Sequence, residues 1–234
     1  MTEGNRVAPE RIRDMFDTIS GVYDPMNTVI SGFQEPRWRR RAISAAALRP
    51  GMRALDVATG TGKVAHGLWR AVQPGGEVTG VDFAEGMLTV ARSRYADALG
   101  LRFVRGDALD LPVEDASFDA ATIAFGMRNL ADYQRGFAEM RRAVVPGGRV
   151  VCLEIARPTT RIARAAQAWF DRVVPVIGRV AGQGAAYGYL VTSTQDYPEP
   201  ARIAGIMREA GLVDVRWEAL TLGIVTLHVG RRPA

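Results

Sequence analysis

A carboxylate precedes a glycine-rich turn in the segment LDVATGTGKVAHGL, residues 55–68. Gly60, Gly62 and Ala65 fit the loose pattern G-x-G-x-x-G/A, which holds the pyrophosphate of a dinucleotide at a helix N-terminus. Asp56, however, stands four residues before the first glycine, where its charge would repel a pyrophosphate and attract an ammonium or a sulfonium. S-adenosylmethionine carries both cations, an adenosine and no phosphate. The segment therefore favours S-adenosylmethionine over NAD as the cofactor.

Other polar residues follow the next predicted strands along the chain. Asp82 lies about twenty residues beyond Gly60, a spacing at which a carboxylate can accept both hydroxyls of a ribose. Asp107 follows the third strand, where it could bind an adenine amino group. The segment FGMRN, residues 125–129, follows the fourth strand, and Glu154 ends the fifth. Because ligands bind beyond the carboxyl ends of parallel strands, these positions predict one adenosine-binding site.

The elements that must position these residues alternate along the chain. Apolar runs predict strands at residues 52–58, 77–82, 101–107, 118–125 and 149–155. Helical patterns separate these strands at residues 62–72, 85–99 and 132–145. The alternation predicts an α/β fold with a Rossmann-like, doubly wound sheet. A helix over 201–212 then precedes two strands, 213–220 and 223–230, whose short separation favours an antiparallel hairpin at a sheet edge.

Two further segments are expected to be helical and to cover the site. The first 48 residues should form a lid, with one helix over 12–19, a break over 21–27 caused by glycine and proline, and a second helix over 36–48. Residues 160–200 should form a helical insertion over the substrate site.

Composition places the chain among single-domain globular proteins. Hydrophobic residues make up 47% of the 234 residues, which excludes disorder, and nothing divides residues 1–234 into separate domains. We find no signal peptide and no apolar run long enough to span a membrane. The one cysteine, Cys152, cannot form a disulfide within the chain, so a cytoplasmic location is expected. One cysteine and two distant histidines also cannot form a zinc site, so no metal is expected.

The net charge of +5 is densest in the run Arg37–Arg41. A solvated helix face explains this run, and contact with a lipid or an anionic substrate is the alternative. No nucleic-acid-binding motif accompanies the run, so nucleic acid is not expected as a partner.

The strand-end residues together resemble those of the class I S-adenosylmethionine-dependent methyltransferases, whose seven-stranded mixed sheet has its last strand antiparallel. A narrower resemblance, over nearly the whole chain, is to the ubiquinone/menaquinone biosynthesis C-methyltransferases. The matching N-terminal motifs are Tyr23-Asp24-x-Met26-Asn27, Ser31 and Trp38-x-Arg40. The other matching motifs are Phe125-Gly126-x-Arg128-Asn129, Tyr187-x-Tyr189-Leu190 and Leu222-Gly223-Ile224-Val225-x-Leu227-His228-x-Gly230.

The strand ends and the resemblance together assign the site residues. The residues expected to bind the cofactor are Asp56, Thr59, Gly60, Thr61, Gly62, Asp82, Phe83, Asp107, Ala108 and Ala124. The residues expected to contact the substrate are Tyr23, Met26, Asn27, Trp38, Phe125, Tyr187 and His228. Arg128 stays protonated, so it would stabilise a phenolate or orient a water, and Asn129 would hold that water or a substrate hydroxyl. Asp24 is the candidate base, and His228 is the other candidate.

The resemblance implies ring C-methylation of a prenylated quinol, such as demethylmenaquinol. A lipid-tailed substrate implies peripheral contact with the inner surface of a membrane, and a homodimer is left open. The chain departs from the family over Gly32–Arg37, where Glu35 stands at the usual histidine position, and this leaves the identity of the quinone open.

Three other functions compete with this one. The chain could methylate a small natural product without a prenyl tail. It could bind the cofactor without transferring the methyl, as a cyclase or a regulatory module. A nicotinamide-dependent oxidoreductase is the third, and Asp56 disfavours it.

Overall fold

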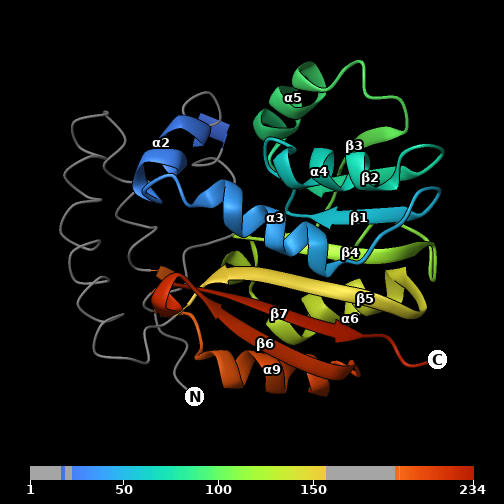
Figure 1. The fold of residues 1–234 in the computed structure, drawn as a ribbon. Coiled ribbons are helices and arrows are strands. Elements are labelled where there is room, and N and C mark those ends of the chain that lie inside the picture. The colour runs from blue at the N-terminus through green and yellow to red at the C-terminus, as the bar shows by residue number, and fades with distance from the viewer. Residues whose placement is uncertain (1–16, 19–22, 157–192, 195) are drawn as a thin grey trace.

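A seven-stranded sheet carries the fold in the computed structural model, which describes residues 17–18, 23–156, 193–194 and 196–234 (Figure 1). The strand order is β3-β2-β1-β4-β5-β7-β6. The strands are β1 (Arg53–Val57), β2 (Glu77–Asp82), β3 (Leu101–Arg105), β4 (Phe118–Ala124), β5 (Val144–Ile155), β6 (Val213–Leu220) and β7 (Val225–Arg231). β1 to β5 pair in parallel, and β7 pairs antiparallel with both β5 and β6. The predicted seven-stranded mixed sheet with a C-terminal hairpin is therefore confirmed.

The point where the strand order reverses lies between β1 and β4. From β1 the chain first adds β2 and β3 on one side, and then crosses to add β4 and β5 on the other. Loops on the two sides of such a switch point leave in opposite directions, which opens a crevice at the carboxyl ends of the strands. The loops after β1 and β4 hold several of the predicted residues, namely Thr59, Gly60, Thr61 and Gly62 for the cofactor and Phe125 for the substrate.

Helices pack on both faces of the sheet. One face carries α3 (Glu35–Ala45), α4 (Lys63–Val72) and α5 (Glu85–Arg94), and the other carries α6 (Tyr133–Ala143) and α9 (Pro200–Glu209). Each helix buries an apolar stripe, as with Phe137 and Met140 of α6. Burying side chains of this size stabilises a fold by about 1.5–3 kcal/mol each, so the strand-end loops stand on a rigid base.

The N-terminal segment differs from the prediction. A break was expected over 21–27, but α2 (Tyr23–Ile30) is helical there. Pro25 stands in the first turn of α2, where a backbone N–H has no partner within the helix, so its absence costs little. α2 lies beside the loop after β1, at the carboxyl end of the sheet (Figure 1).

Four helices end earlier than predicted, among them α3 at Ala45 and α9 at Glu209, and β5 starts earlier. α5 ends at Arg94 and α6 at Ala143. β5 begins at Val144, and the ladder between β4 and β5 shifts its register between Phe118 and Ala120. Most of the predicted helix over 12–19, and nearly all of the insertion over 160–200, fall outside the described residues. In the part of the chain described here, no helix has both the length and the apolar character needed to cross a membrane.

Candidate functional site

Asp56 is a buried carboxylate near the end of β1. Its side chain accepts two hydroxyl hydrogen bonds, from Thr59 Oγ1 at 2.7 Å and from Thr122 Oγ1 at 2.6 Å. Burial raises its pKa from 3.8 to about 6, although both hydrogen bonds act in the opposite direction. Asp56 is therefore mostly ionised at neutral pH, and it lines a small pocket together with the turn that follows β1.

The two glycines of this turn are needed for different reasons. Gly60 has φ of 55° and Gly62 has φ of 80°, a region that other residues adopt at a cost. A Cβ at Gly62 would lie 2.7 Å from the Phe103 ring, whereas a Cβ at Gly60 would meet no atom within 4 Å. Gly62 is thus required by packing, and Gly60 leaves its backbone open to a ligand.

Asp82 joins the turn to the end of β2. Its Oδ2 accepts the N–H of Gly60 at 2.7 Å, and its Oδ1 accepts the N–H of Ala84 at 3.0 Å. Burial raises its pKa from 3.8 to about 6, against these amide hydrogen bonds. Phe83 beside it is half-buried.

Asp107 lies past the end of β3 and is exposed, and its Oδ1 accepts the N–H of Leu109 at 2.9 Å. Ala108 is buried against the core. Because the sheet order is β3-β2-β1-β4, the positions Asp107, Asp82, Asp56 and Ala124 follow one another along one edge. The structure thus brings the predicted cofactor residues together.

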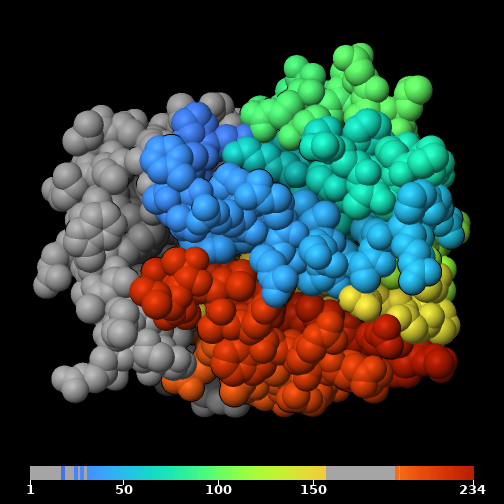
Figure 2. Space-filling model, in the orientation of Figure 1, coloured from blue at the N-terminus to red at the C-terminus, as the bar shows by residue number. Residues whose placement is uncertain are grey.

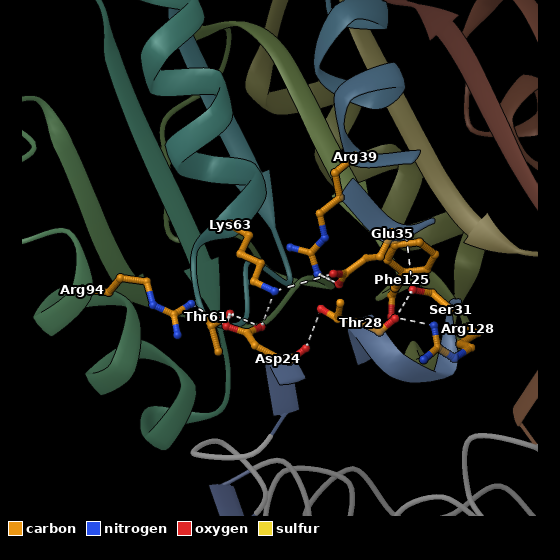
Figure 3. Close-up of polar contacts among 10 residues, drawn as sticks. All are labelled: Asp24, Thr28, Ser31, Glu35, Arg39, Thr61, Lys63, Arg94, Phe125 and Arg128. Atoms are coloured by element: carbon orange, nitrogen blue, oxygen red, sulfur yellow. Dashed lines mark hydrogen bonds and ion pairs between the residues drawn. The ribbon is translucent and has the colours of Figure 1, made fainter. Parts of the chain in front are cut away.

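Asp24 fastens α2 to the loop after β1. The Thr61 hydroxyl donates to it at 2.9 Å, Lys63 Nζ lies at 3.2 Å, and Arg94 Nη1 donates at 2.5 Å (Figure 3). Burial raises the pKa of Asp24, but the hydrogen bond from Arg94, the charge of Lys63 and the hydrogen bond from Thr61 outweigh it and lower the pKa. A carboxylate with a lowered pKa is a poor proton acceptor near neutral pH. The structure thus argues against the predicted role of base and favours an ionic clamp.

Glu35 opens α3 and is buried in the same network. Its Oε1 accepts Arg39 Nη2 at 2.5 Å, and its Oε2 lies 3.5 Å from Lys63 Nζ. Its backbone N–H donates to Ser31 Oγ at 3.3 Å, and Ser31 Oγ donates to the carbonyl of Thr28 at 3.0 Å (Figure 3). The departure at Glu35 therefore places an ion-paired acid, shared by two cations, beside the loop after β1.

A second polar group lies where β4 and β5 end. Arg128 Nη1 donates to Glu154 Oε1 at 2.6 Å and to the carbonyl of Phe125 at 2.7 Å. The Arg128 backbone N–H also donates to Glu154 Oε2 at 3.2 Å. Both side chains are almost completely buried, at 5% and 0% exposed. Arg128 stands in the short helix η1 (Met127–Asn129), which also carries the half-buried Asn129.

Trp38 of α3 forms a wall of this second group. Its ring centroid lies 6.1 Å from that of Phe125, and its indole N–H donates to the Thr221 hydroxyl at 2.8 Å. Phe125 has φ of 60°, a strained conformation that turns the chain out of β4 toward η1. Asn27 lies on α2 and is half-buried. The predicted substrate residues Trp38, Phe125 and Asn27 therefore border the carboxyl edge of the sheet.

Of the other predicted substrate residues, His228 is the one whose side chain belongs to the described part of the chain. Tyr23 and Met26 belong to α2, and the structure describes only their backbone. Tyr187 lies outside the described residues. His228 is fully buried on β7, and its Nε2–H donates to the carbonyl of Pro200 in α9 at 2.9 Å. Burial lowers its pKa to about 4, against that hydrogen bond, and leaves it neutral. Its part in substrate contact or as a base is a wrong prediction, because α9 covers it.

Several site residues were missed or not assigned by sequence reasoning. These are Arg39, Lys63, Arg94, Thr122 and Glu154. Glu154 had a signal, because it is a lone acid at the end of an apolar strand. Arg39 was not singled out because the whole run Arg37–Arg41 was interpreted as a solvated helix face.

The described residues fit an adenosyl cofactor with a cationic tail. Buried carboxylates stand at the ends of β1 and β2, and the backbone of Gly60 is open to approach. Arg39 Nε is a buried donor that has no hydrogen-bond partner among the described residues. Such an unsatisfied donor beside the pocket is consistent with a ligand that supplies an acceptor.

Comparison with known proteins agrees with this geometry. The model of the ubiE/COQ5 methyltransferase family matches residues 5–232. A protein of Staphylococcus aureus (strain JH9) named demethylmenaquinone methyltransferase is 40% identical over 228 residues, covering 97% of this chain and 95% of that protein.

Solved structures show the same fold at low identity. A SAM-dependent methyltransferase from Thermotoga maritima superposes with a TM-score of 0.66 at 18% identity, covering 94% of this chain and 98% of that one. A SAM-dependent methyltransferase from Aquifex aeolicus superposes with a TM-score of 0.60 at 16% identity, covering 83% of this chain and 89% of that one. Together with the match over nearly the whole chain, the strand-end site identifies the chain as a member of the ubiE/COQ5 methyltransferase family and an S-adenosylmethionine-dependent methyltransferase.

Proposed function

We propose that the chain methylates a ring carbon of demethylmenaquinol, a quinol with a prenyl tail. The name of the Staphylococcus aureus relative supports this substrate, since 40% identity extends over 97% of the chain. The structural observation that carries the proposal is the buried Arg128–Glu154 pair, which lies one strand away from the predicted cofactor edge. It supplies a fixed cation where an acceptor oxygen would become negative.

The cofactor residues would hold the adenosine across β3 and β2 and the methionine half over β1 and β4. Asp82 would accept the ribose hydroxyls, and Asp107 the adenine amino group. Asp56 would favour the cationic tail through its charge. When bound, S-adenosylmethionine supplies an electrophilic methyl on its sulfonium.

Arg128 would act on the acceptor. A quinol oxygen that loses its proton to water leaves a phenolate, and the Arg128 guanidinium would stabilise that charge. The ring carbon would form a bond to the methyl that the bound cofactor supplies. The methylated ring carbon would then lose its proton, and the oxygen beside Arg128 would regain one, which restores the quinol. Phe125 and Trp38 would exclude water and orient the ring, because positioning accounts for much of the rate in such a transfer.

Incubation with S-adenosylmethionine and a panel of reduced acceptors tests the proposal by mass spectrometry. The panel holds demethylmenaquinol, a 2-polyprenyl-methoxy-benzoquinol and short-tailed analogues. A gain of one methyl on demethylmenaquinol is the expected result. Methylation of only the short-tailed analogues would overturn the proposal and favour a natural-product methyltransferase, the alternative that Glu35 at the family's histidine position leaves open. Cofactor binding with no methylated product would instead favour a non-methylating relative.

A lipid-tailed substrate also leads us to propose peripheral contact with the inner surface of a membrane. Arg37, Arg40 and Arg41 are exposed on α3, and Phe33 just before α3 is 70% exposed. Basic side chains beside an exposed aromatic suit an anionic bilayer. Sedimentation with vesicles that contain anionic lipid should retain the protein, and replacing these arginines with glutamine should release it.

A further inference from the structure

Arg39 is a cation that lines the pocket over the ends of β1 and β4. The pocket is lined by Arg39, Asp56, Ala58, Thr59, Gly60, Thr61, Val64 and Ala124. Among these residues Arg39 is the one base and Asp56 the one acid. Arg39 reaches the pocket from α3, which packs on α4 and against β4 and β5. Its side chain is only 13% exposed, so the guanidinium is held in the interior.

One donor of this guanidinium has a hydrogen-bond partner and another donor has none among the described residues. Nη2 donates to Glu35 Oε1 at 2.5 Å (Figure 3). Nε is buried and has no hydrogen-bond partner among the described residues. A buried donor without an acceptor is destabilising, and beside a pocket a ligand can supply the missing acceptor. Glu35 fixes the position of the guanidinium and leaves Nε for a second acceptor.

The part of the cofactor expected here is the methionine half. Under the proposed function the ribose lies at Asp82 on β2 and the adenine at Asp107 beyond β3. The strand order continues to β1 and β4, so the rest of the molecule extends over the pocket that Arg39 lines. The methionine half ends in an α-carboxylate, an acceptor that matches a guanidinium.

The nearby cations are already engaged elsewhere. Lys63 Nζ lies 3.2 Å from Asp24 and 3.5 Å from Glu35. Arg94 is paired with Asp24, and Arg128 with Glu154. None of the three lines this pocket in the described part of the chain. Arg39 is therefore the cation best placed for an anion in it.

We infer that Arg39 binds the α-carboxylate of the cofactor through its Nε–H, and that Glu35 is the positioning residue for its guanidinium. The inference rests on the proposed function for the direction in which the cofactor lies. It gives a use to Glu35, the residue by which the chain departs from its family. It also separates Arg39 from the basic run around it, since Arg40 and Arg41 are exposed.

Calorimetric titration with two ligands tests the inference without any methyl acceptor. S-adenosylmethionine carries the α-carboxylate, and decarboxylated S-adenosylmethionine lacks it but keeps the adenosine, the sulfonium and the amine. Arg39→Met should weaken the affinity for S-adenosylmethionine by about 10- to 100-fold. It should weaken the affinity for decarboxylated S-adenosylmethionine by less than about 3-fold. Arg41→Met is the matched control, because it removes the same charge from the same helix, where Arg41 pairs with Glu218 at the surface. It should change neither affinity.

Equal weakening of both ligands, or no weakening of either, would overturn the role of Arg39. Wild-type protein should itself prefer S-adenosylmethionine by the factor that Arg39→Met removes, and equal affinities would contradict the inference without any variant. If Arg39→Met does not fold, Arg39→Lys keeps the charge but lacks an Nε–H beside Nη2, so the preference should fall at least about 3-fold. Failure of wild-type protein to bind either ligand would reject the proposed function instead.

Discussion

Single residues set the charge of this site, and two buried acids dominate it. Asp56 and Asp82 both have a pKa raised to about 6 by burial, although each accepts hydrogen bonds that favour its ionised form. A cationic ligand beside Asp56 would stabilise its ionised form and offset part of the desolvation penalty of that buried charge. Under the proposed function we therefore expect cofactor binding to depend on pH through these two carboxylates.

Affinity for S-adenosylmethionine should fall as the pH drops below about 6, by at most about tenfold per unit for Asp56, because a cationic ligand favours the ionised acid. Titration calorimetry from pH 5 to 8 measures this. Asp56→Asn should make the affinity for S-adenosylmethionine depend less on pH. The affinity for 5′-methylthioadenosine, which has no cationic group, should vary only with the titration of Asp82. A profile that Asp56→Asn leaves unchanged would contradict the role of its charge.

Stability without ligand should move in the opposite direction. The pKa values of Asp56 and Asp82 are higher in the folded state than the ordinary 3.8, so the folded state binds protons more tightly. The contribution of these two acids to the free energy of unfolding is therefore highest at acid pH and is lost as the pH rises through about 6.

Arg128 neutralises a buried acid, and under the proposed function it also stabilises the phenolate. Arg128→Met should abolish turnover and lower the free energy of unfolding by about 3 kcal/mol, since it leaves Glu154 buried without its cation. The double variant Arg128→Met with Glu154→Gln should recover much of that stability and none of the turnover. Thermal melts and initial rates on the two variants separate the roles. Recovery of activity in the double variant would show that Arg128 acts only through packing.

Helices and loops, rather than strands, close the site at the scale of elements. α2 is tied to the loop after β1, to α4 and to α5 through the one carboxylate of Asp24. The pKa of Asp24 is lowered, so its ion pairs stabilise the fold at any pH above the ordinary carboxyl pKa. This stabilisation is lost as the pH falls through the lowered pKa. Because Asp24 contacts these three neighbours, α2 is held beside the loop that lines the pocket.

Asp24→Asn should loosen this clamp without removing a proton acceptor. We expect cofactor affinity to weaken by about 3- to 10-fold, and kcat at saturating cofactor to change by less than about 5-fold. Arg94→Gln, which removes a partner of the same carboxylate, should reproduce part of the loss in affinity. Loss of a general base costs about 100- to 10,000-fold in rate, so a collapse of kcat in Asp24→Asn would restore the catalytic role.

The whole molecule joins residues that are far apart in the sequence. The indole N–H of Trp38 in α3 donates to Thr221, 183 residues away in the short helix η2 (Thr221–Gly223) between β6 and β7. This contact ties α3 to the antiparallel hairpin. Figure 2 shows the α3 and hairpin segments as one continuous surface. It also supports the ring that packs on Phe125.

Removing either partner of this long-range hydrogen bond should lower the free energy of unfolding. Thr221→Val should cost about 1 kcal/mol, and Trp38→Phe somewhat more, because the smaller ring also leaves a gap. The double variant should cost less than the two single variants combined, since both remove one interaction. Chemical denaturation of the four proteins gives the coupling energy, and strict additivity would mean that the hydrogen bond contributes nothing.

The sequence by itself determined the sheet and the ends of its strands. Alternating apolar runs have a period set by the backbone, so β2 and β6 were predicted with their observed bounds, and the strand-end acids followed from them. The charge of Asp56 before the glycines also favoured S-adenosylmethionine over NAD as the predicted cofactor. These are local properties, which neighbouring residues decide.

Only the tertiary structure decided which charges meet. Asp24, Glu35, Lys63 and Arg94 come from different elements, and no periodicity records that they lie within hydrogen-bond or ion-pair distance of one another. The same holds for His228, which the motif suggested for the substrate and which α9 covers. Whether a polar side chain serves as a base, a clamp or a core residue depends on its burial and its partners, and both are set by packing between distant segments.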